Sequence, residues 1–242
     1  MSEEDKPAAA PRRPGRPAKA LLTQADIARG ALAIIDEKGW HNCTMKALAQ
    51  SLGVRSPSLY HHIDGQGALV SLVRALIVTQ IHDPTIVDLP WDEAIRRFAI
   101  AYYRVFSAHP NTIQVLSTTP VRDADTVGMY ETFVRVFVGG GGEIGRALGA
   151  LIELENLALG FAYAANAEEV LLDPSFVETF SAPLLAEATR SRTDQDGVSE
   201  TSFLGLLNRY IDILRRDFED AAVHAFPHHP MTSTDSEKGP HS

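Results

Sequence analysis

Apolar residues recur at the helical spacing of i, i+3, i+4 and i+7 along most of this chain. The first two long stretches predict helices over residues 24–38 and 66–81; Gly39 ends the first and Pro84 follows the second. Further stretches predict helices over 91–108, 111–117, 123–138, 143–166 and 201–222. A helix is also expected to begin at Asp173-Pro174, and Pro183 is expected to end or kink it. A run of four glycines, 139–142, is expected to be a flexible connector. The pattern therefore predicts an all-α fold.

A shorter stretch, residues 44–62, predicts two brief helices joined by a tight turn. Thr44 is a suitable N-cap for the first, and Gly53 can take the left-handed conformation that ends it. Ser56 is expected to cap the second helix, with Pro57 at its first position. Outward-facing polar and aromatic side chains on such a second helix are typical of a helix-turn-helix that enters the DNA major groove. The alternative is a pair of core helices with no DNA role.

The distribution of charge favours the DNA-binding interpretation. The whole chain has a net charge of −9, which by itself argues against a nucleic-acid partner. Residues 11–80 nevertheless hold nine Lys/Arg and four Asp/Glu, a net charge of +5, whereas residues 81–242 hold 12 Lys/Arg and 24 Asp/Glu, a net charge of −12. Positive charge is thus concentrated on the part of the chain that has the motif.

A Pro-rich basic arm precedes the first predicted helix. Its Gly15-Arg16-Pro17 core, with Arg12 and Arg13 before it, resembles an AT-hook. An extended arginine segment of this type fits the narrow minor groove of A·T-rich DNA. We expect residues 1–20 to be disordered in the free protein and to contact the groove or the phosphates of DNA. The alternative is a solubilising tail.

Residues 22–81 resemble the DNA-binding domain of the tetracycline-repressor (TetR) family. The resemblance rests on Gly39-Trp40, on the run TMKALA at 44–49, and on Leu-Gly-Val followed by Ser-Leu-Tyr-His-His-Ile at 52–63. It implies an all-helical, homodimeric repressor whose C-terminal domain binds a small molecule and releases DNA. It also implies that the following residues face DNA: Thr44, Lys46, Ser56, Pro57, Ser58, Tyr60 and His62.

The chemistry of these side chains suits the role. Hydroxyl groups such as that of Tyr60 bind phosphate oxygens, and Lys46 and Arg55 are long enough to reach a guanine edge or a phosphate. Gln66 stands where the family usually has a phosphate-binding Lys, so we expect the basic arm to compensate. The complete expected DNA site is Thr44, Lys46, Arg55, Ser56, Pro57, Ser58, Tyr60, His61, His62, Arg12, Arg13 and Arg16.

The C-terminal part, residues 88–223, is expected to be a larger helical bundle that binds the effector and dimerises, followed by a disordered tail at 224–242. The helix over 143–166 is apolar on nearly all sides, which is expected when one face lines a core and another contacts a partner. By the resemblance, this helix and the one over 201–222 form a four-helix bundle with a second copy of the chain. The expected partners are therefore a double-stranded DNA operator, a second copy and a small-molecule effector.

An effector site would combine apolar and aromatic side chains with a few polar groups. Glu153 and Asn156 lie three residues apart in an apolar helix and would need partners if buried. A cationic ligand would need Glu153 or Glu155 to be unpaired. For the aromatic candidates the alternative is an ordinary core. The candidate residues are Tyr102, Tyr103, Phe106, Met129, Phe133, Phe137, Glu153 and Asn156.

Other kinds of site find little support in the sequence. It contains no phosphate-binding glycine loop, nucleophile elbow or HExxH helix, so we expect no enzyme, no cofactor and no metal site. His61 and His62 would point about 100° apart on a helix, so they cannot readily share a metal ion. Cys43 is the single cysteine and is expected to be a small core residue rather than a redox sensor. Without a signal peptide or an unbroken apolar segment, the chain is expected to be cytoplasmic and free of membrane spans.

Together these features predict a ligand-responsive transcriptional repressor. It would bind a palindromic operator as a dimer and be released by a small molecule. The alternatives are an architectural or ligand-activated DNA-binding protein, and a small-molecule carrier or enzyme with no DNA role.

Overall fold

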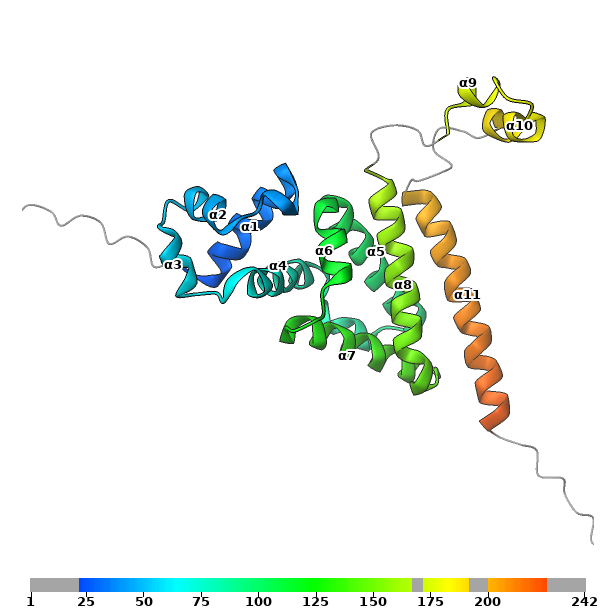
Figure 1. Cartoon of the computed structure of the whole chain (residues 1–242). Helices are drawn as coiled ribbons and strands as arrows, with labels where there is room; N and C mark the ends of the chain where they lie inside the picture. The colour runs from blue at the N-terminus through cyan, green and yellow to red at the C-terminus, as the bar shows by residue number, and fades with distance from the viewer. Residues whose placement is uncertain (1–21, 167–171, 192–199, 226–242) are drawn as a thin grey trace, which may run out of the picture.

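The computed structural model describes residues 22–166, 172–191 and 200–225, which form helices joined by short connections (Figure 1). The N-terminal unit consists of α1 (Gln24–Lys38), α2 (Met45–Ser51), α3 (Ser56–Tyr60) and α4 (Gly65–Ile81). The C-terminal unit consists of α5 (Trp91–Ala108), α6 (Ile113–Thr118), α7 (Ala124–Gly139), α8 (Ile144–Ala164), α9 (Pro174–Val177), α10 (Pro183–Ser191) and α11 (Glu200–Ala225). Short 3-10 turns precede α2, α5 and α6, namely η1 (Trp40–Asn42), η2 (Pro84–Asp88) and η3 (Pro110–Thr112). The prediction of an all-α fold is confirmed.

Helix α4 connects the two units. It packs against α1 in the N-terminal unit and against α5, α6 and α7 in the C-terminal unit. Its buried residues Leu69, Val73, Ile77 and Ile81 recur every fourth position, so they lie along one face. Buried side chains of both units form one continuous hydrophobic cluster. A movement of α4 would therefore displace residues that pack against it in both units.

The local signals at the helix-turn-helix are confirmed with one correction. The Thr44 side chain accepts a hydrogen bond from the Ala47 N–H, and Gly53 has a φ of +62° after the end of α2. The prediction that Ser56 caps α3 is wrong by one position. Arg55 is the N-cap, and its carbonyl accepts the first hydrogen bond of the turn, from the Ser58 N–H at 2.8 Å. Pro57 tolerates the second position because the first turn of a helix needs no N–H from it.

Two further expectations differ from the structure. Pro183 does not end a helix that begins at Pro174 but starts one of its own, so α9 and α10 are separate short helices. A proline fits the first turn of a helix and does not fit its interior, which explains this division. Two of the glycines at 139–142, Gly140 and Gly142, are closely packed, so the run is not a loose connector. A Cβ atom at Gly140 would collide with Trp91, and one at Gly142 would collide with Phe137.

Helix α8 is long and apolar enough, by length and composition, to cross a bilayer. Its Ala147, Leu151, Leu154, Ala158 and Ala162 are nevertheless buried, and the helix packs against α5, α7 and α11. Figure 1 shows α8 and α11 running side by side at the edge of the C-terminal unit. We therefore interpret α8 as a core helix rather than a membrane span.

Candidate DNA-reading head and effector cavity

Helices α2 and α3 form a reading head, defined here as residues 44–62. Its inner side is closed by Leu48, Ala49 and Leu59, all of which are buried. The predicted contact residues face the other way. Tyr60 is a large aromatic residue, yet it is 55% exposed. It therefore does not belong to the core that closes the inner side of the reading head. Thr44, Lys46, Arg55, Pro57 and His61 are exposed, and Ser56, Ser58 and His62 are half-buried.

Two glutamine side chains hold the reading head on its scaffold. Gln24 of α1 donates a hydrogen bond from Nε2 to the carbonyl oxygen of His62, at 3.0 Å. Gln66 of α4 donates from Nε2 to the carbonyl oxygen of Cys43, at 3.1 Å, directly before α2. Gln66 therefore ties the start of α4 to the start of the reading head, a role that the sequence did not indicate. Arg12, Arg13 and Arg16 lie outside the described residues.

A cavity of about 240 Å³ lies inside the C-terminal unit, between α4, α5, α7, α8 and the end of α6. Four of the eight candidate pocket residues line it: Tyr102, Phe106, Met129 and Asn156. The other four lie elsewhere. Tyr103 stacks on Phe203 with ring centroids 4.5 Å apart, Phe133 and Phe137 are fully packed in the core, and Glu153 is exposed and accepts a hydrogen bond from the Tyr210 hydroxyl at 3.0 Å.

Glu155 is the carboxyl group that reaches the cavity. A residue four positions from Leu151 and three from Ala158 lies on the buried face of α8, a signal that the sequence contained. Burial raises the pKa of Glu155, while hydrogen bonding of its carboxyl group by the hydroxyls of Tyr130 and Tyr102, and then the charge of Arg74, act to lower it. Its Oε1 atom is buried and has no hydrogen-bond partner among the described residues. The cavity thus contains one buried acceptor atom, Glu155 Oε1, to which no described residue donates a hydrogen bond.

Arg74 is the second charged residue of the cavity, and the sequence analysis missed it. It belongs to α4, is only 5% exposed, and donates from Nη2 to the carbonyl oxygens of Leu116 at 2.9 Å and Thr119 at 2.6 Å. Leu116 and Thr119 themselves line the cavity. The helix that leads to the reading head is therefore bonded to a wall of the cavity.

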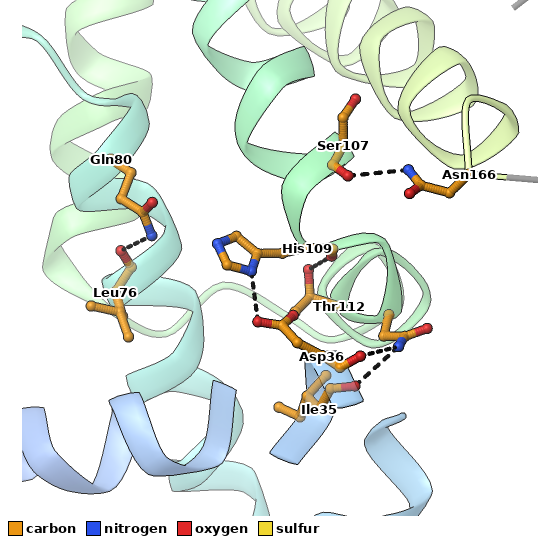
Figure 2. A network of polar contacts seen from close by, with 9 residues as sticks. Ile35, Asp36, Leu76, Gln80, Ser107, His109, Thr112 and Asn166 are labelled. Atoms are coloured by element: carbon orange, nitrogen blue, oxygen red, sulfur yellow. Dashed lines mark hydrogen bonds and ion pairs between the residues drawn. The ribbon is translucent and has the colours of Figure 1, made fainter. Parts of the chain in front are cut away.

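The same wall is also bonded to α1. We call residues 109–119, which comprise η3 and α6, the η3–α6 segment. His109 Nδ1 lies 2.9 Å from Asp36 Oδ2, and the Asn111 side chain donates from Nδ2 to the carbonyl oxygens of Ile35 and Asp36, each at 3.1 Å (Figure 2). A hydrogen bond of 2.6 Å from Thr112 Oγ1 to the His109 carbonyl oxygen fixes the turn. One segment thus contacts the cavity, α1 and α4.

Other chemistry is not indicated. The described residues contain no group of three or more His, Cys, Asp or Glu side chains arranged to hold a metal ion. Cys43 is buried, its Sγ lies 3.8 Å from the Ala31 carbonyl oxygen, and burial raises its pKa to about 11. A thiol of this kind is a core residue rather than a reactive one.

An exposed reading head on a scaffold that is hydrogen-bonded to a cavity-bearing helical unit is the arrangement expected of a helix-turn-helix DNA-binding protein with a regulatory domain. Comparison with known proteins gives a family match for the segment around the reading head. Residues 27–71 match the model described as bacterial regulatory proteins, tetR family. The part of the chain that contains the reading head is thus similar to this family.

The relatives cover different parts of the chain. An uncharacterised helix-turn-helix-type regulator of Mycobacterium tuberculosis is 33% identical over 113 residues, which is 46% of this chain and about half, 51%, of that protein. The class D tetracycline repressor protein of Escherichia coli is 27% identical over 191 residues, 76% of this chain and 85% of that protein. The similarity therefore extends well beyond the reading head.

Solved structures agree on the fold. Apo ActR of Streptomyces coelicolor superposes with a TM-score of 0.71 at 23% identity, over 84% of this chain and all of that one. ActR in complex with actinorhodin gives a TM-score of 0.66 at 25% identity, over 81% of this chain and 97% of that one. The helical domain with its cavity thus has the fold of a protein that has been solved with a small molecule bound.

Proposed function

We propose that this chain is a ligand-responsive repressor, which binds its operator through the reading head and releases it when a small molecule enters the cavity. The observation that carries the proposal is the η3–α6 segment, because it lines the cavity and is hydrogen-bonded to both α1 and α4. The relatives support it, since they include tetracycline repressor proteins and an ActR complex with actinorhodin.

The mechanism is a shift between two arrangements of α4. Without ligand, Arg74 holds α4 against the carbonyl oxygens of Leu116 and Thr119. A molecule in the cavity contacts Arg74 and these wall residues, so it changes the position of α4 and, through the Gln66 hydrogen bond, of the reading head. Ligand and operator then weaken each other's binding by the same factor, as linkage requires.

The repressor is proposed to act as a dimer through α8 and α11. Ile144, Leu148 and Ile152 are 67%, 58% and 48% exposed and lie at four-residue spacing along one face of α8. Leu206 and Ile213 of the adjacent α11 are also exposed. Apolar side chains that are exposed at every turn of a helix mark an interaction surface. Two copies joined here would place two reading heads on half-sites roughly 34–36 Å apart.

A charge on this face tests the dimer. Leu148→Arg is expected to convert the dimer into a monomer in light scattering and to abolish operator binding, because one head reads too few base pairs. Val127→Arg, at an exposed apolar position on α7, is the matched control and should remain dimeric. A dimer that persists in Leu148→Arg would contradict this interface.

The basic arm is proposed to strengthen DNA binding by contacts with the phosphates or the minor groove. Deleting residues 1–20 should weaken operator affinity and make its salt dependence shallower, while the sequence preference is kept. If deletion abolishes all binding, the chain acts as an architectural DNA-binding protein led by the arm. The same proposal places the chain in the cytoplasm, where its operator is.

The experiment that tests the function is footprinting of the full chain on the DNA that flanks its own gene, repeated with a panel of small molecules. The proposal expects a symmetric footprint that a cavity ligand removes. A footprint that appears only with ligand would make the chain a ligand-activated regulator. Absence of any footprint would refute a role on this DNA.

A further inference from the structure

We infer that Glu155 recognises a protonated amine, so that the effector is a compact, largely apolar amine whose cation pairs with this carboxylate. The inference rests on the proposed effector role of the cavity and specifies the chemical class of the ligand. It follows from three features of the cavity. These are a Glu155 oxygen without a hydrogen-bond partner among the described residues, the Arg74 guanidinium that is already hydrogen-bonded to the cavity wall, and an aromatic lining.

The first feature is the unpaired acceptor. Glu155 projects from the buried face of α8, and its Oε1 atom has no hydrogen-bond partner in the described part of the chain. The ion pairs formed within 4.0 Å by the described residues do not include Glu155. A buried carboxylate is costly unless it is paired and hydrogen-bonded. A ligand that brings an N–H donor and a positive charge removes this cost on binding.

The second feature is the state of Arg74, the other charged residue in the cavity. Its Nη2 atom donates to the carbonyl oxygens of Leu116 and Thr119, so the guanidinium is held toward the end of α6. It is not within ion-pairing distance of Glu155, although its charge helps to lower the pKa of that carboxyl. Arg74 is therefore occupied in fixing the wall, and the negative charge of Glu155 remains available to a ligand.

The third feature is the lining around the carboxyl group. Tyr102 and Tyr130 flank Glu155, and Phe106 lies against Tyr102 with ring centroids 4.8 Å apart. Aromatic faces attract cations, so they add to the selection of an amine. Ile77, Met129 and Leu159 provide an apolar surface for the rest of the molecule. The volume of about 240 Å³ lies just below the usual range of ligand sites, which favours a compact body.

The inference is tested with three probes that share one apolar body: naphthylmethylamine, naphthylmethanol and naphthoic acid. Binding of each to the full chain is measured by calorimetry near neutral pH, without DNA. We expect the amine to bind at least about tenfold more tightly than the alcohol, and the acid to bind most weakly. Glu155→Gln should weaken binding of the amine by about tenfold or more and change the affinity for the alcohol by less than about threefold.

Glu153→Gln is the matched control, because Glu153 is the same residue type two positions away on α8 but lies outside the cavity. It should leave amine binding unchanged. Thermal melting confirms that both variants are folded. The inference is overturned if the acid binds as tightly as the amine, if Glu155→Gln leaves the affinity for the amine unchanged, or if none of the probes binds the folded chain.

The readout does not depend on the operator, so the two proposals fail separately. Amine binding that requires Glu155, without any footprint on DNA, would support the recognition and refute the repressor. A footprint that other ligands remove, without amine binding, would support the repressor and refute the recognition of a cation.

Discussion

The link between α1 and the η3–α6 segment can be tested with one side chain. Asn111→Ala removes the two hydrogen bonds to the carbonyl oxygens of Ile35 and Asp36 in the last turn of α1. A neutral hydrogen bond contributes about 0.5–1.5 kcal/mol, so we expect the loss of two to lower the free energy of unfolding by about 1–3 kcal/mol. For a chain of this size, each kcal/mol lowers the melting temperature by about 2–4 °C.

The structure provides a close control in Asn166→Ala. The Asn166 side chain also donates two hydrogen bonds from Nδ2 to backbone carbonyl oxygens. One is to Ser107 at 3.1 Å (Figure 2), and the other is to Ala162 at 2.9 Å. Asn111 and Asn166 are both exposed. Asn166 connects α8 to the end of α5 and does not contact α1. The two variants should therefore lose similar stability in urea unfolding.

Only Asn111→Ala should change regulation. The measured quantity is the ratio of operator Kd with and without an effector found by footprinting. Loss of a link in such a network changes coupling by about 0.5–2 kcal/mol, which corresponds to roughly a 2- to 30-fold smaller ratio. The contact between Asp36 and His109 remains, so coupling should be reduced rather than abolished. An unchanged ratio in Asn111→Ala, or an equal change in Asn166→Ala, would show that the η3–α6 segment does not transmit the signal to α1.

Three other predictions follow from single side chains. Tyr60→Ala should weaken operator binding in gel shifts by about 2 kcal/mol or more and leave the melting temperature unchanged, because Tyr60 is exposed; unchanged affinity would remove it from the site. Cys43 should resist alkylation at pH 8 in the folded protein and react after unfolding, since burial raises its pKa to about 11; rapid labelling of the native state would contradict this. Glu155→Gln should stabilise the ligand-free chain near neutral pH, because burial disfavours the charged carboxylate. Because its pKa is raised in the folded state, the stability contributed by Glu155 is present below its ordinary pKa of 4.5 and is lost as pH rises through the folded pKa. Urea unfolding at several pH values should therefore show that the extra stability of Glu155→Gln disappears below pH 4.5. The charged and titratable groups that face Glu155 are Arg74, Tyr102 and Tyr130.

Features that depend on neighbouring residues were predictable from the sequence. The bounds of α1, 24–38, follow from apolar spacing and from Gly39, and the observed helix has these bounds. The cap at Thr44 and the left-handed Gly53 depend on hydrogen bonds and torsions within a few residues, so the sequence contains all that is needed. At α3 two adjacent residues compete for one cap position, and the choice depends on how the chain enters from α2.

The cavity was less predictable because it is formed by segments far apart in the sequence. Tyr102 and Tyr103 are adjacent, and spacing alone predicts that both are buried. Tyr102 lines the cavity, whereas Tyr103 stacks on Phe203 of α11. The position of α11 relative to α5 cannot be read from the residues around Tyr103. Periodicity therefore identifies the buried faces but not the part of a buried face that remains uncovered.

Buried charge is the exception, because it is visible in the sequence and indicates function. Arg74 lies four residues from both Val70 and Val78, and Glu155 lies four residues after Leu151, so both charges occupy buried faces. Such residues cost stability unless each one is paired. Arg74 is compensated by the two carbonyl oxygens at the end of α6, whereas Glu155 keeps an unpaired oxygen. One of these charges therefore holds the wall of the cavity to α4, and the other is the group that we infer recognises an effector.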